Sequence, residues 1–358
     1  MISLIGSLVS FVFALIVFVK ILQDHTSRII INETLGGRLL VSELISILLF
    51  SLFIAISSVS PSYFYAWLFT VLGIGIIRLG FVVYIILSEA IRGANLILGK
   101  AIGLSIILGA SYVSYAMYIN PVKTGIFWER YLIMNQWWFY DVVFLATLYF
   151  IGVISTALTV ASIARNTKIF RQRTRALRDF ILLYAPPAIG LSIDVILVNI
   201  LRMISFDVYK IIVCLTLVAI IISILLALRQ ALYPLALGSS MILSIVVVDL
   251  MSAKKIFDWS PFMDRHTVDA IVGLIWGSDD VANRILGDSI RLIQLGRGCI
   301  VFTRSSRFLV TIYSSRYVDI YSALAKVILY AVKDVERSFD EKYLGRAIEE
   351  RIKPFLLS

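Results

Sequence analysis

The feature that most constrains this chain is a series of long apolar segments. Seven stretches of about 20 residues carry few or no charged side chains, and a helix of that length crosses the hydrocarbon core of a bilayer. They are residues 2–21, 39–59, 64–87, 101–119, 139–163, 180–201 and 208–228. Only 16% of the 358 residues are charged, whereas roughly a quarter are charged in soluble proteins. The sequence therefore predicts an integral membrane protein built on an α-helical bundle of seven spans.

The basic residues predict which side of the membrane each connection occupies. Lysine and arginine collect in cytoplasmic connections, and six of them separate the fifth stretch from the sixth. These six are Arg165, Lys168, Arg171, Arg173, Arg175 and Arg178. Placing them inside gives eleven basic residues in the inner connections and four in the outer ones. We therefore expect a multi-pass protein of the cell membrane with its N-terminus outside and its C-terminus in the cytoplasm.

The same six basic residues allow two roles. They could bind the anionic headgroups of the lipid bilayer, at about 1 kcal/mol for each residue near the surface. Alternatively, they act only as the signal that sets the topology.

The segment after the seventh stretch allows two structures. Residues 231–248 are uncharged and could form an eighth span, which would place the tail outside. However, Pro234 and Gly238 interrupt the first half and leave residues 241–248 as a compact run rich in Ile and Val. Such a run is typical of a buried strand. We expect the strand, with the eighth span as the alternative.

The composition of the chain changes near residue 233 and predicts a second domain. Basic residues outnumber acidic ones by 17 to 9 in residues 1–232, but by only 16 to 14 in residues 233–358. Alternating apolar residues predict strands at 241–248, 255–259, 289–295, 299–303 and 308–313. Spacings of three and four predict helices around 268–275, at 318–339 and at 341–352. Hairpin-length connections make the last three strands antiparallel neighbours, so we expect a small α+β domain.

The element order of residues 233–358 resembles that of the longin and roadblock-like superfamily. The stretches that carry the resemblance are ILSIVVVDLMSAKKIFDW, HTVDAIVGLIW and SIRLIQLGRGCIVFTRSSRFLVTIYSS, followed by a long helix. The resemblance covers about a third of the chain and implies a five-stranded antiparallel sheet with helices on its faces. It also implies a platform for a cytoplasmic protein partner, frequently a small GTPase, or for a second copy as a homodimer. The seven spans with an outside N-terminus resemble receptor-type sensor modules joined to signalling outputs.

Polar side chains are rare within the predicted spans, and a charge at that depth is a candidate functional site. The candidates are Glu43, Arg78, Asp194 and Asn199. Arg78 could belong to a ligand or ion site, form a structural ion pair with Glu43 or Asp194, or extend its head group towards water. Arg78 and Asp194 differ in depth by roughly 10 Å at 1.5 Å per residue. A long arginine side chain bridges only part of that difference.

Two consecutive prolines predict a distortion of the sixth span. Pro186 and Pro187 each remove a backbone donor, and tolerated breaks of this kind recur where membrane helices move or line cavities. The pair is therefore a candidate hinge, with a static kink as the alternative.

The residue types leave little material for catalysis. Two histidines and two cysteines without metal-ligand spacing predict no metal site, no disulfide and no cofactor. The sequence contains no G-x-x-x-x-G-K-[ST], H-E-x-x-H or G-x-S-x-G motif. No reader motif accompanies the net charge of +10, so nucleic acid is not an expected partner. We expect a non-enzymatic membrane sensor or adaptor that couples the bundle to a protein-binding domain. The alternative is a transporter or transporter subunit whose tail regulates or assembles it.

Overall fold

The structure is a computed structural model in which the chain folds into two compact units. It describes residues 2–91, 109, 119–124, 126–132, 146–147, 149–151, 153–154, 157–158, 161, 170–192, 206–228, 242–252, 254–260, 263–286, 290–295, 298–314 and 320–336. Unit 1 comprises Met1–Arg28, Leu35–Ser162 and Ala176–Leu232, and unit 2 comprises Ile29–Thr34, Ile163–Arg175 and Tyr233–Ser358. The boundary between the units therefore falls within two helices, α2 (His25–Glu33) and α7 (Phe170–Ser192).

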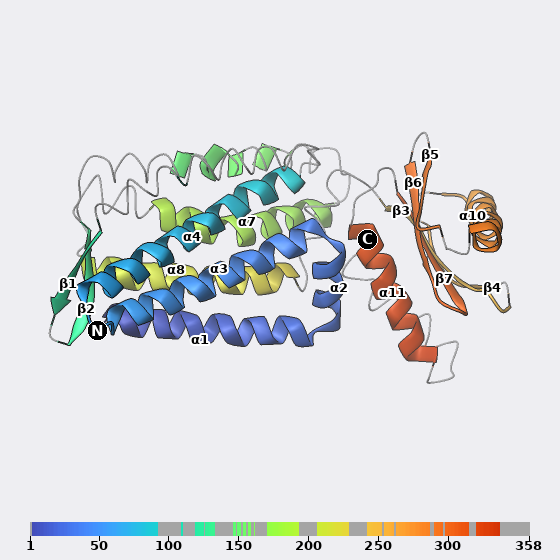
Figure 1. Ribbon diagram of the computed structural model, residues 1–358. Coiled ribbons are helices and arrows are strands. Elements are labelled where there is room, and N and C mark those ends of the chain that lie inside the picture. The colour runs from blue at the N-terminus through green and yellow to red at the C-terminus, as the bar shows by residue number, and fades with distance from the viewer. Residues whose placement is uncertain are drawn as a thin grey trace. The chain divides into compact units, whose positions relative to one another are not determined.

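Unit 1 is mainly helical (Figure 1). Its helices include α1 (Ile2–Gln23), α3 (Leu35–Ser58), α4 (Tyr63–Ile91), most of α7, and α8 (Phe206–Leu226). Among the described residues, three helices are long and apolar enough to cross a membrane, within Leu4–Gln23, Leu35–Ser58 and Tyr63–Gly80. These helices correspond to the first three predicted spans.

The described residues do not support the prediction of seven spans. α7 and α8 contain shorter apolar segments, Phe180–Gly190 and Ile211–Leu226, at the predicted sixth and seventh spans. The fourth predicted span lies outside the described residues except at positions 109 and 119, and the fifth is described only at scattered positions. The described residues thus support a helical region with three helices that are long and apolar enough to cross a membrane.

The basic connection before the sixth predicted span is helical in its described part. α7 begins at Phe170, about ten residues before the apolar segment, and carries Arg171, Arg173, Arg175 and Arg178. Arginine, glutamine, alanine and leucine are good helix formers, and neither proline nor glycine interrupts residues 170–179. Local propensity therefore extends the helix beyond the part that hydropathy detects.

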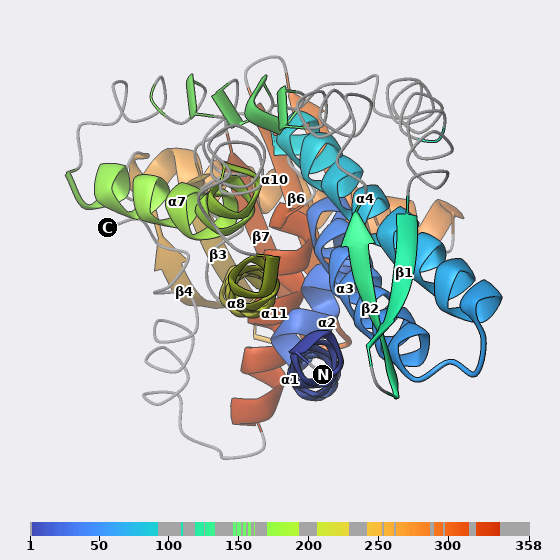
Figure 2. The ribbon, with the colours of Figure 1, turned by 90° about the vertical axis from the view of Figure 1, so that its left-hand side faces the viewer.

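The helices α3 and α4 form an antiparallel hairpin, and Figure 2 shows them side by side. Near the turn, Ser57 Oγ donates to the carbonyl oxygen of Ala66 over 2.7 Å and lies 2.7 Å from Thr70 Oγ1. Further from the turn, Gly80 of α4 faces Glu43 of α3. The pairs 57 with 66 and 43 with 80 define one antiparallel register.

Unit 2 contains a five-stranded antiparallel sheet in the order β4-β3-β7-β6-β5. Its strands are β3 (Ile242–Asp249), β4 (Lys254–Trp259), β5 (Leu292–Leu295), β6 (Gly298–Arg304) and β7 (Phe308–Ser314). The antiparallel sheet is confirmed, as is a strand rather than a membrane span at residues 242–249. The predicted strand at 289–295 is shorter than expected.

The sheet of unit 2 carries one helix on each face, α10 (Arg265–Leu286) and α11 (Ile320–Glu336) (Figure 1). Strand side chains alternate between the two faces. One set packs with Val268 and Ile275 of α10, and its buried members are Val246, Val248, Ile300, Phe302 and Leu309. α11 contacts β6 and β7. The predicted helix at 341–352 lies outside the described residues.

Local chemistry explains two boundaries in unit 2. Asp264 caps α10, because its carboxylate accepts hydrogen bonds from the Thr267 amide at 2.9 Å and the Thr267 hydroxyl at 2.6 Å. Gly298 begins β6 where the chain runs close to β7. A Cβ at this position would lie 2.7 Å from the Ser314 carbonyl oxygen, so a side chain does not fit there.

Candidate functional site

The structure buries two of the four predicted intramembrane residues. Glu43 is 3% exposed on α3, and Arg78 is 7% exposed on α4. Asp194 and Asn199 lie outside the described residues, so their relation to Arg78 stays a prediction. Arg165 and Lys168 also lie outside the described residues.

The Glu43 carboxyl occupies a niche that Gly80 makes possible. A Cβ at position 80 would lie 2.9 Å from both Cδ and Oε1 of Glu43 and still closer to Oε2. Any side chain larger than hydrogen would therefore displace the carboxyl group. Glycine costs about 1 kcal/mol relative to alanine in a helix interior, and space for Glu43 is what this glycine provides. The sequence alone did not single out Gly80, because the contact depends on the register of α3 against α4.

The environment of Glu43 offers little compensation for a negative charge. Its Oε2 atom has no hydrogen-bond partner, and no ion pair to Glu43 occurs among the described residues. Glu43 lies eight residues into α3, about 12 Å from the start of a helix about 36 Å long. A charged group buried in this way is costly and is by default a functional candidate in a membrane protein.

Arg78 lies at a similar depth but on another side of α4. It precedes Gly80 by two residues, which corresponds to about 3 Å along the axis and about 200° around it. Glu43 and Arg78 therefore lie at nearly the same depth along the α3–α4 pair. The helical geometry does not direct the guanidinium to the side of α4 that faces Glu43.

The two prolines of α7 lie in a continuous helix that neighbouring hydroxyl groups support. Without N–H groups, Pro186 and Pro187 leave the carbonyl oxygens four residues earlier, at Leu182 and Leu183, without their helical donors. Ser223 Oγ of α8 donates to the Leu182 carbonyl oxygen.

A second hydroxyl group bonds to a carbonyl oxygen two residues further along the same helix, which neither proline leaves without its helical donor. The Tyr149 hydroxyl donates to the Tyr184 carbonyl oxygen over 2.7 Å, and both side chains are buried. Tyr149 and Ser223 were both missed from the sequence. For Ser223, the rule that a proline frees the carbonyl four residues earlier was a usable signal, but neither proline frees the Tyr184 carbonyl. The choice between a hinge and a static kink at Pro186 and Pro187 stays a prediction.

A β-hairpin in the outer connection between the fourth and fifth predicted spans packs on the turn between α3 and α4. It consists of β1 (Ile119–Thr124) and β2 (Phe127–Leu132). Trp128 Nε1 donates to the Ser60 carbonyl oxygen over 2.8 Å, and the Trp128 ring meets Tyr63 edge to face with centroids 6.0 Å apart. These contacts fix the hairpin to the end of the α3–α4 pair.

Unit 2 incorporates part of the connection between α1 and α3. Residues Ile29–Thr34 belong to this unit, Ile30 and Thr34 are buried, and Glu33 Oε1 lies 2.5 Å from Lys326 Nζ of α11. At 100° per residue, the buried side chains of α11 cover about 240° of the circumference of the helix. That arc is wider than the stripe of about 100° by which a surface helix usually meets a core.

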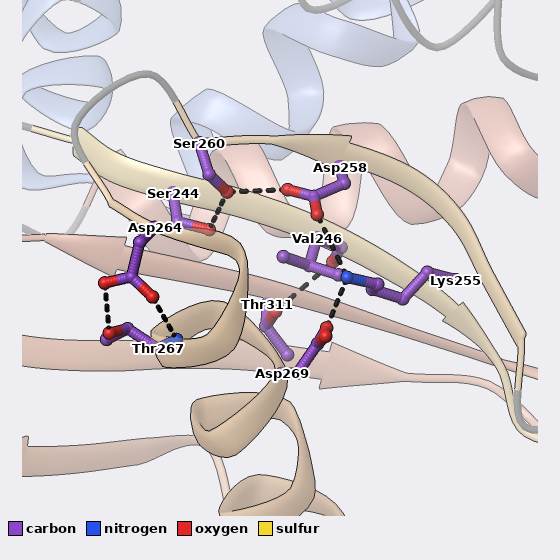
Figure 3. Close-up of polar contacts among 9 residues, drawn as sticks. All are labelled: Ser244, Val246, Lys255, Asp258, Ser260, Asp264, Thr267, Asp269 and Thr311. Atoms are coloured by element: carbon purple, nitrogen blue, oxygen red, sulfur yellow. Dashed lines mark hydrogen bonds and ion pairs between the residues drawn. The ribbon is translucent and has the colours of Figure 1, made fainter.

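Polar contacts also join β4 to α10, as Figure 3 shows. Lys255 Nζ pairs with Asp269 of α10 and lies 3.2 Å from Asp258 Oδ2. The hydrogen bond to Asp269 is the main cause that raises the pKa of the Lys255 ammonium. Ser260 Oγ donates to Asp258 Oδ1 over 2.6 Å. Partly exposed ion pairs contribute only about 0–1 kcal/mol to stability. We therefore assign this network to the positioning of α10 against β4 and do not treat it as a candidate functional site.

The Asp249–Arg307 pair predicts how unit 2 responds to acid. Asp249 is 6% exposed and accepts hydrogen bonds from Arg307 Nη2 at 3.1 Å and the Met251 amide at 2.9 Å. Burial by itself raises the pKa of Asp249, but these hydrogen bonds outweigh it and hold the pKa below the ordinary 3.8. The pair therefore stabilises unit 2 above about pH 4, and the contribution is lost as the pH falls through the lowered pKa.

Asp249→Asn tests that prediction. At neutral pH, we expect the free energy of unfolding of the variant to be lower than that of the wild type by about 1 kcal/mol. The loss is modest because the Arg307 side chain is partly exposed. The difference from the wild type should shrink as the pH falls from about 5 to about 2. Thermal unfolding of both proteins across this pH range measures the effect. A difference that stays constant down to about pH 2 would contradict the assignment.

A comparison with models of known protein families finds no match for this chain, and a comparison with curated proteins finds none either.

Proposed function

We propose that the protein is a non-enzymatic membrane sensor or adaptor whose helical region is mechanically coupled to the sheet domain in unit 2. One observation carries this proposal. The connection between two membrane-crossing helices, α1 and α3, contributes residues 29–34 to unit 2, where Glu33 pairs with Lys326. A sheet domain that was only tethered at its end would not include a segment from between the first two spans.

The connection is short and consists mainly of the helix α2, which favours transmission of a displacement. The Asp24 side chain accepts a hydrogen bond from the Ser27 amide at 2.8 Å at the start of α2. At the other end, Thr34 Oγ1 donates to the Ile30 carbonyl oxygen over 2.7 Å, and α3 begins at the next residue. A shift of α3 would therefore pull directly on the segment that pairs with Lys326.

We place the sheet domain in the cytoplasm. Positive charges predict an inner location for the connection between α1 and α3, and residues 29–34 of that connection belong to the same unit as the sheet. The predicted inner location of the tail agrees with this assignment. The membrane and the domain would then meet at the cytoplasmic surface of the lipid bilayer.

We further propose that the sheet domain is longin-like and binds a protein partner. The five-stranded antiparallel sheet with a helix on each face supports this resemblance. α10 also exposes Leu274 and Val281, which are 52% and 54% exposed and lie seven residues apart on the same side of the helix. A small GTPase or a second copy of the chain are the partners that the resemblance implies.

A perturbation at Gly80 tests the coupling. Gly80→Ala should displace the Glu43 carboxyl and shift α3. If the shift reaches α11 through α2, amide hydrogen exchange of α11 should accelerate by about tenfold, which corresponds to about 1.4 kcal/mol. The measurement is hydrogen exchange with mass spectrometry on the full-length protein in lipid nanodiscs.

Gly6→Ala is the matched control for this experiment. A Cβ at Gly6 would lie 3.6 Å from the Cys214 Cβ, which is an ordinary contact, so this variant should leave α11 unchanged. Lys326→Ala should weaken the response of α11 to Gly80→Ala, because the pair with Glu33 is one of the contacts that hold residues 29–34 in unit 2. If α11 exchanges at the same rate in all variants, the domain is merely tethered and the sensor proposal is wrong.

A transporter or transporter subunit is the second candidate, and Glu43 favours it. Buried carboxyl groups within membrane helices recur on ion and proton pathways. In that case the sheet domain regulates or assembles the transporter, and α11 need not respond to changes at Gly80.

A further inference from the structure

The Glu43 carboxyl occupies a built niche rather than an accidental gap. Glu43 is 3% exposed, and its Oε2 atom has no hydrogen-bond partner among the described residues. Gly80 provides the space, because a Cβ there would overlap the carboxyl group. A niche shaped around one carboxyl group, without a donor for it, favours the neutral acid over the anion.

Among the described side chains, no ionisable group on the neighbouring helices forms an ion pair with the carboxyl group. On α4, Arg78 lies at a similar depth but about 200° around the helix from Gly80. From unit 1, Tyr149 lies within electrostatic range, yet it donates its O–H to the Tyr184 carbonyl oxygen. On α1 the one ionisable residue is Lys20, in the last turn and exposed.

The strand β2 and the helix α8 also contact α3. Cys214 of α8 lies against Gly6 and Ser10 of α1, with Sγ 3.4 Å from both the Gly6 carbonyl oxygen and Ser10 Oγ. The thiol therefore faces α1. Among the described residues, no group of three or more His, Cys, Asp or Glu side chains could hold a metal ion.

We infer that Glu43 is a membrane-buried proton-binding site, neutral at physiological pH, whose loss of a proton is the stimulus that the bundle detects. Deprotonation would leave a charge in an apolar niche, which favours movement of the carboxyl group away from Gly80. Such movement shifts α3 relative to α4. As a stimulus, the site rests on the proposed sensor function, whereas proton binding itself does not.

Labelling with dicyclohexylcarbodiimide tests the proton site. This apolar reagent enters the hydrocarbon region and reacts with a protonated carboxyl group. The acid O–H adds across a C=N bond, the oxygen bonds to carbon, the nitrogen takes the proton, and the adduct rearranges to an N-acylurea without a leaving group. On the full-length protein in detergent micelles, we expect one adduct in the peptide that contains Glu43. Its yield should fall about tenfold or more between about pH 6 and about pH 9.

Matched variants make the result decisive. Glu43→Gln should abolish the adduct yet keep the wild-type melting temperature at about pH 6, because glutamine has nearly the shape of the neutral acid. Glu33→Gln removes the carboxyl group that pairs with Lys326 outside the spans, and it should leave labelling unchanged. Gly80→Ala should reduce labelling by displacing the carboxyl group.

Two outcomes would overturn the inference. One is a folded wild-type protein in which the Glu43 peptide stays unlabelled at every pH. The other is a Glu43 adduct whose yield does not depend on pH. Neither outcome bears on the exchange of α11, so failure of the proton site and failure of the sensor proposal are distinguishable.

Discussion

Leu324→Asp should unfold the sheet domain while leaving the helices of unit 1 folded. Leu324 is 1% exposed in α11, which packs on β6 and β7. Replacing leucine removes buried apolar contacts worth about 2–5 kcal/mol, and an unpaired carboxylate adds the cost of burying a charge. The combined loss of about 4 kcal/mol or more is a large part of the 5–15 kcal/mol that typically stabilises a domain.

Limited proteolysis of the full-length protein in detergent measures this effect. We expect rapid cleavage within residues 242–336, whereas α1, α3 and α4 stay resistant. Lys333→Asp is the control, since it places the same side chain at an exposed position of the same helix. Wild-type resistance of Leu324→Asp would show that α11 does not pack on the sheet.

Ser223→Ala should destabilise the bundle by about 1–3 kcal/mol, the usual cost of leaving a buried polar group without its partner. The reason is specific, because Pro186 cannot donate to the Leu182 carbonyl oxygen and Ser223 does so instead. In a Pro186→Ala background the helix supplies its own N–H to that carbonyl. The cost of Ser223→Ala should then fall below about 0.5 kcal/mol.

Pro187→Ala provides the matched background for this cycle. It restores a donor to the Leu183 carbonyl oxygen and not to Leu182, so Ser223→Ala should keep its full cost. Thermal unfolding in detergent of the single and double variants measures the cost of Ser223→Ala in the wild type and in each of the two proline backgrounds. Equal costs of Ser223→Ala in the two proline backgrounds would refute the assignment of Ser223 to the Leu182 carbonyl.

The pattern of side chains along the chain was enough to predict the sheet of unit 2. Alternating apolar residues located β3, β4, β6 and β7 to within about a residue, and short connections predicted their hairpins. Such signals are local, since each strand shows its two faces within a few residues. The same kind of signal located the first three apolar helices, but it missed the polar start of α7.

The sequence alone determined a membrane protein with long apolar helices, an α+β tail and rare charges within the helices. Hydropathy and periodicity are properties of single segments, so they are readable without knowing which segments meet. Only the tertiary structure decided that Gly80 faces Glu43, that Ser223 serves the carbonyl freed by Pro186, and that residues 29–34 join the sheet domain. Each of these contacts joins different elements of the chain. Their partners depend on how helices pack against one another, which no local pattern of residues encodes.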